Sequence, residues 1–90
     1  MDYDRNTLLE FPCHFPLKVM GKNHDEFEIF VLSTIKKHLK TELSETAVKA
    51  RPSKNGRFVS LTVTFEAHSQ QQIDDIYLEL TAHELVLMAL

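Results

Sequence analysis

The stretch that decides the fold is SKNGRFVSLTVTFEA, residues 53–67. Its Asn55-Gly56 pair is the strongest short sequence signal for a tight β-hairpin. In residues 58–67 apolar and mostly polar side chains then alternate, as they do in a strand with one buried and one exposed face. The apolar set is Val59, Leu61, Val63, Phe65 and Ala67, and the other set is Phe58, Ser60, Thr62, Thr64 and Glu66. We expect a hairpin whose second strand covers a core on one side.

Three other segments have the character of strands. Residues 15–21 alternate apolar side chains with others, and Gly21 ends the run. Residues 44–52 alternate in the same way up to Pro52, which suits a strand at the edge of a sheet. Residues 84–90 are apolar on both sides, so we expect a cover on each face of this strand or a partner chain.

Two segments have the period of helices. From about residue 24 to residue 41, apolar side chains recur at spacings of three and four, with carboxylates in the first turn and lysines toward the end. Asn23 followed by Glu26 is typical of a capping box at the start of this helix. Ser69 followed by Gln72 forms the same pattern before a second helix, which ends near residue 82.

The order strand, helix, strand, strand, helix, strand predicts an α+β domain with the ferredoxin-like, or split βαβ, arrangement. Right-handed crossovers place both helices on one face of a four-stranded antiparallel sheet, with the first and third strands central. We assign residues 15–90 to this single domain and residues 1–14 to an N-terminal arm. The second face of the sheet is then open unless a partner covers it.

Length, charge and cysteine content narrow the class of protein. A chain of 90 residues suffices for one domain. Its residues are 43% hydrophobic and 26% charged, which is typical of a globular protein. The single Cys13 excludes an internal disulfide framework, and a net charge of −3 argues against a nucleic-acid-binding domain. No stretch is apolar enough to span a membrane and the N-terminus lacks a signal-peptide pattern, so we expect a cytoplasmic protein.

Several stretches resemble the YbeD-like family of small bacterial proteins, whose function is uncharacterised. These stretches are LLEFP (8–12), FPLKVMG (15–21), RPSKNGRFVS (51–60) and the closing VLMAL (86–90). The sequence departs from the family pattern in the hairpin loop, at Ser53-Lys54-Asn55, and along the first helix. The resemblance implies a ferredoxin-like fold similar to that of regulatory ACT domains, which bind small metabolites. It also implies a regulator rather than a catalyst.

The turn Gly21-Lys22-Asn23 is the first candidate for a ligand site. It joins a central strand to a helix N-terminus, where free N–H groups and the helix dipole attract anions. Gly21 would let a ligand approach the backbone closely, and Lys22 would add a positive charge. The hypothesis is a carboxylate or phosphate of a small metabolite, although Asp25 and Glu26 would repel it. The alternative is a plain turn, with Asn23 as the helix cap.

The open sheet face is the second candidate, as a surface for a partner protein or a second copy of the chain. An apolar patch on a small monomer is typical of an interface, so the sequence predicts a homodimer or a protein partner. A basic sheet face also occurs in RNA-binding domains, but those need stacking aromatic residues, and only Phe58 is available. Nucleic acid is therefore the weaker alternative. The residues expected on this surface are Lys18, Met20, Lys49, Arg51, Phe58 and Met88.

No group of residues points to catalysis or to a metal. The five histidines are scattered without an i, i+4 pair, and Asp74 and Asp75 are helix neighbours whose side chains point apart. Acylphosphatases share this fold class but hold phosphate with an arginine in the first loop, where this chain has Lys22. The sequence therefore predicts a non-catalytic regulatory or binding module without cofactor or metal. A small phosphoryl- or acyl-transfer enzyme and an RNA-binding sheet are the alternatives.

Overall fold

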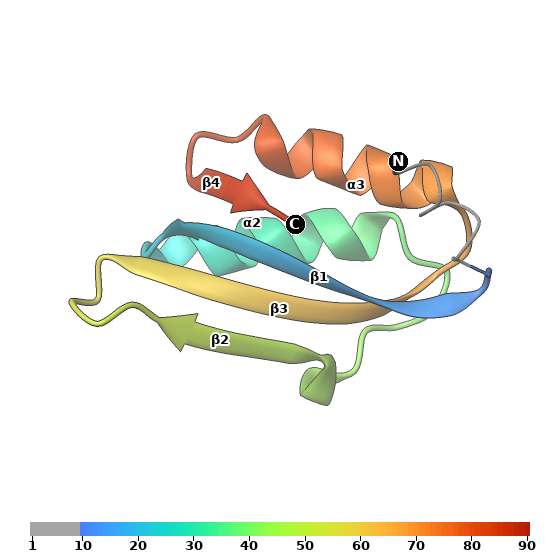
Figure 1. The fold of residues 1–90 in the computed structure, drawn as a ribbon, viewed down its shortest axis with the longest axis horizontal. Coiled ribbons are helices and arrows are strands. Elements are labelled where there is room, and N and C mark those ends of the chain that lie inside the picture. Colours follow the sequence, from blue (N-terminus) through green and yellow to red (C-terminus); the bar gives the residue numbers. More distant parts are fainter. Residues whose placement is uncertain (1–9) are drawn as a thin grey trace, which may run out of the picture.

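The structure is a computed structural model that describes residues 10–90. In this part of the chain, four strands and two α-helices follow one another in the predicted order (Figure 1). Of the predicted N-terminal arm, residues 1–9 lie outside the described residues, and residues 13 and 14 belong to the first strand. The elements are β1 (Cys13–Lys22), α2 (Asp25–Lys37), a 3-10 turn (Glu45–Ala47), β2 (Val48–Pro52), β3 (Phe58–Ala67), α3 (Gln70–Thr81) and β4 (Val86–Ala89).

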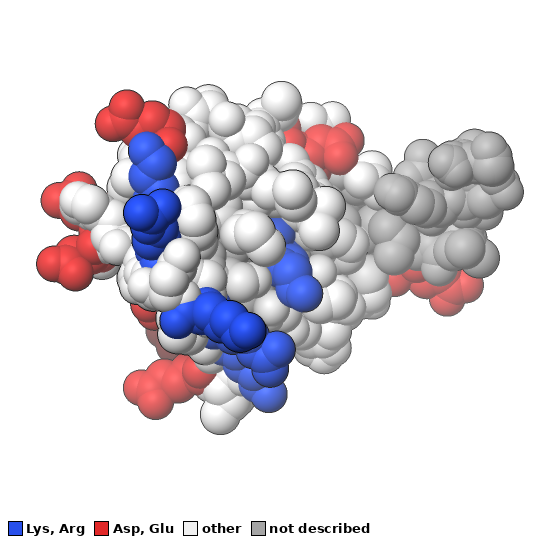
Figure 2. Space-filling model, turned by 60° about the vertical axis from the view of Figure 1, so that its left-hand side comes forward, with Lys and Arg blue, Asp and Glu red and all other residues white. Residues whose placement is uncertain are grey.

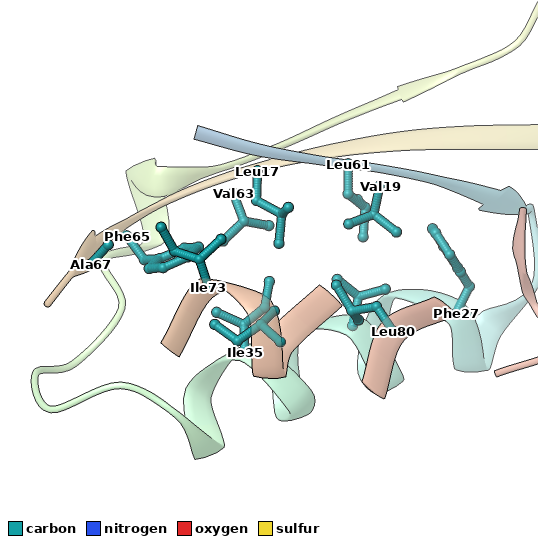
Figure 3. Packing of buried hydrophobic residues seen from close by; sticks show 12 residues of the cluster. Leu17, Val19, Phe27, Ile35, Leu61, Val63, Phe65, Ala67, Ile73 and Leu80 are labelled. Carbon is teal, nitrogen blue, oxygen red and sulfur yellow. The ribbon is translucent and has the colours of Figure 1, made fainter. Parts of the chain in front are cut away.

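The strands form one antiparallel sheet in the order β2-β3-β1-β4, so β1 and β3 are central, as predicted. These two strands pair along their whole length, from Cys13 opposite Ala67 to Lys22 opposite Phe58. Both helices lie on the same side of the sheet (Figure 3). The arrangement is the ferredoxin-like fold that the element order predicts.

The core lies between the two helices and one face of the sheet. Figure 3 shows side chains of β1 and β3 pointing toward side chains of α2 and α3. The strict alternation in β3 places Leu61, Val63 and Phe65 in this core, each no more than 2% exposed. Burying a side chain of this size stabilises a fold by roughly 1.5–3 kcal/mol. The other buried apolar residues are Leu17, Val19, Phe27, Val31, Ile35, Ala67, Ile73, Ile76 and Leu80.

Both ends of α2 differ from the prediction. The N-cap is His24 instead of Asn23, and its Nδ1 accepts a hydrogen bond from the N–H of Glu26 at 3.1 Å. The helix ends at Lys37, four residues earlier than expected, with His38 as its C-cap. The carbonyl of His38 accepts a hydrogen bond from the side-chain amide of Gln72 at 2.8 Å. A side chain of α3 thus bonds one of the carbonyls that the end of α2 leaves without a partner inside the helix.

The start of α3 follows the predicted cap. The Ser69 hydroxyl accepts a hydrogen bond from the N–H of Gln72 at 3.1 Å. The side-chain oxygen of Gln72 accepts from the N–H of His68 at 2.6 Å, while its amide reaches the end of α2. Gln72 therefore fixes the start of one helix against the end of the other. Within the described residues no helix is long and apolar enough to cross a membrane.

Two predicted strands are shorter than their sequence patterns. Residues 45–47 form a 3-10 turn because the Ser44 hydroxyl accepts a hydrogen bond from the N–H of Thr46 at 3.2 Å and caps that turn. In β4 the pairing with β1 shifts between Met20 and Gly21, so that Met88 lies opposite Met20 but Val86 lies opposite Gly21. This bulge gives Val86 and Met88 opposite faces, although strict alternation would give them the same one.

Candidate functional site

The turn Gly21-Lys22-Asn23 joins β1 to α2, as the sequence predicts, but Gly21 has a packing role. It is buried, and a Cβ atom there would lie closer than 3.0 Å to ring carbons of Phe27 and to the carbonyl oxygen of Leu85. Real Cβ atoms essentially never come so close to other atoms. The missing side chain therefore admits the Phe27 ring and the β4 backbone, and these atoms fill the space that a ligand would need.

The polar groups of this turn are bonded within the chain. The N–H of Lys22 donates to the Leu85 carbonyl at 3.1 Å, and the N–H of Asn23 donates to the Arg57 carbonyl at 2.9 Å. The Asn23 side-chain amide donates to the Gly56 carbonyl at 2.8 Å. Asn23 thus holds the hairpin loop against the end of β1. This geometry favours a structural role for the turn over the anion site proposed for it.

The open sheet face brings together the six residues predicted there. Across β2, β3 and β1, Lys49 lies opposite Thr62, which lies opposite Lys18. One row further along, Arg51, Ser60, Met20 and Met88 lie opposite one another in that order, across all four strands. Phe58 lies opposite Lys22 at the hairpin end. The sheet register therefore makes one surface from residues far apart in the sequence.

The β1–β4 side of this face is partly apolar. Met20 is 37% exposed and Met88 is 48% exposed. Leu90 exchanges two backbone hydrogen bonds with Lys18, of 3.1 and 2.7 Å, and so continues this side of the face. Phe58, 38% exposed, adds an aromatic ring at the hairpin end. We call Met20, Phe58, Met88 and Leu90 the apolar strip.

The charge of the open face has the opposite sign to that of the chain. The whole chain carries −3, but the strand positions of this face hold four cations and one carboxylate. Figure 2, in which the hairpin end of the sheet comes forward, shows Lys and Arg side chains gathered over the surface in view and Asp and Glu side chains mainly around its edge. The cations are Lys18, Lys22, Lys49 and Arg51, and the carboxylate is Glu66.

Three of these cations line a hollow of about 420 Å³ on the face, and we call them the cation triad: Lys18, Lys49 and Arg51. Ser60 and Thr62 lie between them on β3 and line the same hollow with their neighbour Ala50. No member of the triad forms an ion pair with any residue in 10–90. Alternation along β3 predicts Ser60 and Thr62 on this face but does not mark them as site residues. Their importance depends on the strand register.

A second hollow, of about 620 Å³, lies beside the far half of β3. Its walls come from the segment between α2 and β2, including Thr41, Ser44 and Thr46, and from Thr64 and Glu66 of β3. No pattern in the sequence indicates it, because its walls depend on how residues 38–47 turn after α2. Its lining also includes His14, which lies opposite Glu66 across β1 and β3, and Lys49, which lines the triad hollow as well.

The histidines serve mainly local structure. Besides capping α2 through His24, they connect the helices and the strand ends. His83 stacks on Phe30 with ring centroids 4.0 Å apart, and its Nδ1 accepts from the N–H of Leu85 at 3.1 Å. His68 lies 3.4 Å from Glu66, measured from Nε2 to Oε1. Among the described residues, no three His, Cys, Asp or Glu side chains are grouped so as to hold a metal ion.

A charged cluster joins α2 to α3 away from the open face. Glu79 accepts from Lys37 at 2.7 Å and contacts Nε2 of His38 at 3.0 Å. The hydrogen bond from Lys37, followed by that from His38, lowers the pKa of Glu79 from its usual value of 4.5. This cluster reinforces the helix contact that Gln72 also makes, so we read it as structural.

Comparison with known proteins connects this fold to a family. The family DUF493, described as "Protein of unknown function", matches residues 6–90. A UPF0250 protein of Chromobacterium violaceum is 48% identical over 90 residues, covering 100% of both chains. One from Neisseria meningitidis serogroup A is 44% identical over 87 residues, covering 97% of this chain and 94% of the relative.

Among solved structures, the solution structure of protein HP0495 from H. pylori is similar in fold. Its TM-score is 0.63 at 23% sequence identity, and the match covers 91% of this chain and 85% of that one. At this identity the likeness concerns the fold alone. The sequence matches confirm the family resemblance found in the hairpin and the closing strand. This chain belongs to the DUF493 family, a family of small bacterial proteins of unknown function.

Proposed function

We propose that this chain is a non-catalytic binding module and that the open face of its sheet is the binding surface. The observation that carries the proposal is the asymmetry of the sheet. One face is closed by α2 and α3, whereas the other bears the apolar strip beside the cation triad. A surface that is both apolar and charged, on so small a domain, is typical of a contact site.

The charge of the face indicates the chemistry of what binds. Four cations against Glu66 alone complement a negatively charged partner, and they oppose a positively charged one. A second copy docked face to face would bring eight cations into one interface with two carboxylates. This favours an anionic ligand, or a partner protein with an acidic surface, over a symmetric dimer through this face.

The side chains that line the triad hollow support binding over catalysis. The Ser60 and Thr62 hydroxyls there have no histidine or carboxylate among the lining residues to act as a general base. Lysine and arginine can hold an anion but supply no activated nucleophile at these exposed positions. The likeness to ACT domains favours a regulatory use of such binding.

Affinity capture with two matched variants tests this proposal. Met20→Ser/Met88→Ser removes the apolar strip at its centre, and Ile29→Ser/Leu78→Ser removes two apolar side chains that are each 67% exposed on the helices. Each bait is incubated with bacterial extract, and bound proteins and small molecules are identified by mass spectrometry. Species of interest are then purified, and their binding to wild type and both variants is measured by calorimetry.

We expect a purified species to bind the wild type and the helix variant equally and to bind the sheet variant at least tenfold more weakly. Both variants change solvent-exposed side chains, so both should fold, and circular dichroism checks this. A species that binds the sheet variant normally but loses affinity for the helix variant would place the binding surface on the helices and refute the proposal.

A further inference from the structure

We infer that the hollow of the cation triad is a site for a small, multiply charged anion, namely a phosphate ester or a polycarboxylate. The inference rests on the proposed function and names the ligand class and the residues for one part of the open face. It also moves the anion site from the Gly21-Lys22-Asn23 turn, whose N–H groups are bonded to Leu85 and Arg57, to the sheet.

The strand register sets the spacing of the cations. Lys49 and Lys18 lie on either side of Thr62, on the two strands that neighbour β3. Neighbouring strands are about 4.8 Å apart, so the two lysine Cα atoms lie about 10 Å apart. Arg51 is two residues from Lys49 along β2, about 7 Å away. Their long side chains can therefore converge on one anion above β3.

The floor of the hollow supplies hydrogen-bond donors of the right kind. Ser60 and Thr62 both point to the open face, because Leu61 between them is buried in the core. A hydroxyl can donate to a phosphate or carboxylate oxygen, and a guanidinium can donate two parallel hydrogen bonds to it. Two hydroxyls below and three cations around them form a donor set without an acidic competitor among the lining residues.

The absence of ion pairs between the triad and residues 10–90 also supports an anion site. Three like charges within one hollow repel one another, and no carboxylate of residues 10–90 forms an ion pair with any of them. Elsewhere the chain does pair such groups, since Lys37 contacts Glu79 at 2.7 Å. A bound anion of two or more charges would remove this repulsion, so it gains affinity from every member of the triad.

The size of the hollow is compatible with a small molecule. Its volume of about 420 Å³ lies within the range of roughly 300–1,000 Å³ that small-molecule sites occupy. Nucleic acid would need aromatic platforms for its bases, and Phe58 is the only Phe, Tyr or Trp on the strand positions of this face in residues 10–90. The imidazole of His14 lies at the opposite end of β1. An acidic protein segment would extend along the sheet beyond the three cations.

Calorimetry with three probes tests the inference: inorganic phosphate, pyrophosphate and citrate, each at low salt. We expect pyrophosphate and citrate to bind more tightly than phosphate, and each affinity to fall as salt is raised, because the contacts are charged and exposed. Lys49→Gln and Arg51→Gln each remove one charge while keeping an exposed polar side chain. Each should weaken pyrophosphate binding by roughly five- to tenfold, the effect of losing one charged hydrogen bond.

Lys36→Gln, on the exposed side of α2, is the matched control and should leave affinity unchanged. Equal loss with Lys36→Gln would show diffuse electrostatics and overturn the site. So would loss with Lys22→Gln but not with Lys49→Gln, which would return the anion to the turn. Tighter binding of a ten-nucleotide uridine RNA or of a hexaglutamate peptide than of pyrophosphate would overturn the ligand class.

The two proposals fail in different ways. If none of the three probes binds at millimolar concentration, the anion site is refuted, yet a partner from extract that depends on Met20 and Met88 would still support the open face as the binding surface. If no captured species depends on Met20 and Met88 but pyrophosphate binding depends on Lys49, the anion site stands and the wider surface does not.

Discussion

Replacing Gly21 by alanine should destabilise the protein, because the substitution adds a methyl group where the packing at the end of β1 leaves no space. The new Cβ would lie closer than 3.0 Å to ring carbons of Phe27 and to the carbonyl oxygen of Leu85. Phe27 is fully buried, so its ring cannot move aside without disturbing the core. The Leu85 carbonyl is backbone, and it accepts the 3.1 Å hydrogen bond from the N–H of Lys22 that connects β4 to β1.

The expected magnitude follows from these contacts. Inserting a methyl group into a packed core costs about 1–3 kcal/mol. Loss of the Lys22–Leu85 hydrogen bond adds about 1 kcal/mol. The lower entropy of the unfolded alanine chain offsets about 0.4–1 kcal/mol of this. The free energy of unfolding should therefore fall by about 1–3.6 kcal/mol, which for a domain of this size lowers Tm by roughly 4–29 °C.

Thermal and urea unfolding of Gly21→Ala, followed by circular dichroism, measure this loss. Lys22→Ala is the control, because Lys22 is exposed and its substitution should change the free energy of unfolding by less than about 0.5 kcal/mol. If Gly21→Ala is as stable as wild type, the close packing of Phe27 and Leu85 around this residue is wrong. In that case the role of Gly21 as an opening for a ligand would be restored.

Two further predictions concern the helices. Glu79→Gln should lower Tm at pH 7, and the difference in Tm from wild type should narrow as the pH falls below 4.5. The reason is that the pKa of Glu79 is lowered in the folded state, so the stability that its carboxylate contributes is lost when it is protonated. A difference in Tm that stays constant from pH 7 to pH 3 in thermal unfolding would contradict this. Ser69→Ala should lower the free energy of unfolding by about 1 kcal/mol, because it removes the cap of α3. The hydroxyl of Ser33 bonds only within α2, so Ser33→Ala should lower the free energy of unfolding by less in the same assay.

Local patterns predicted the strands best where one face is buried and the other exposed. Residues 58–67 form a strand with the predicted bounds, because every second side chain reaches the core and a shift of one residue would bury Thr62 and Thr64. The closing strand lacked this constraint, since it is apolar on both sides. There the bulge at Met20 and Gly21 decided which side chains face outward.

Helix ends were predicted less well, because distant partners decide them. Asn23 has the right chemistry for an N-cap, but it bonds the carbonyls of Gly56 and Arg57 in a hairpin loop more than thirty residues away in the sequence. His24 then takes over the cap. The end of α2 likewise depends on Gln72 of α3. Patterns among neighbouring residues do not contain these long-range contacts, so they cannot predict where such a helix begins or ends.

The residues of the candidate site were likewise predicted only in part. Alternation along each strand was enough to place Lys18, Lys49 and Arg51 on one face. The register between strands was needed to put Ser60 and Thr62 among them, and no pattern within a single strand contains that information. The turn at Gly21 was singled out for its glycine, and only its three-dimensional neighbours reveal that the glycine admits protein atoms.

Methyl NMR of the intact protein tests most directly whether the open face is the binding surface. Labelling methionine and isoleucine methyl groups with ¹³C gives reporters on both sides of the molecule: Met20 and Met88 on the open face, and Ile29, 67% exposed, on α2. Fractionated bacterial extract is added, and the methyl signals are followed. We predict that a fraction shifts or broadens Met20 and Met88 and leaves Ile29 unchanged. A fraction that shifts Ile29 and leaves both methionines unchanged would contradict the account.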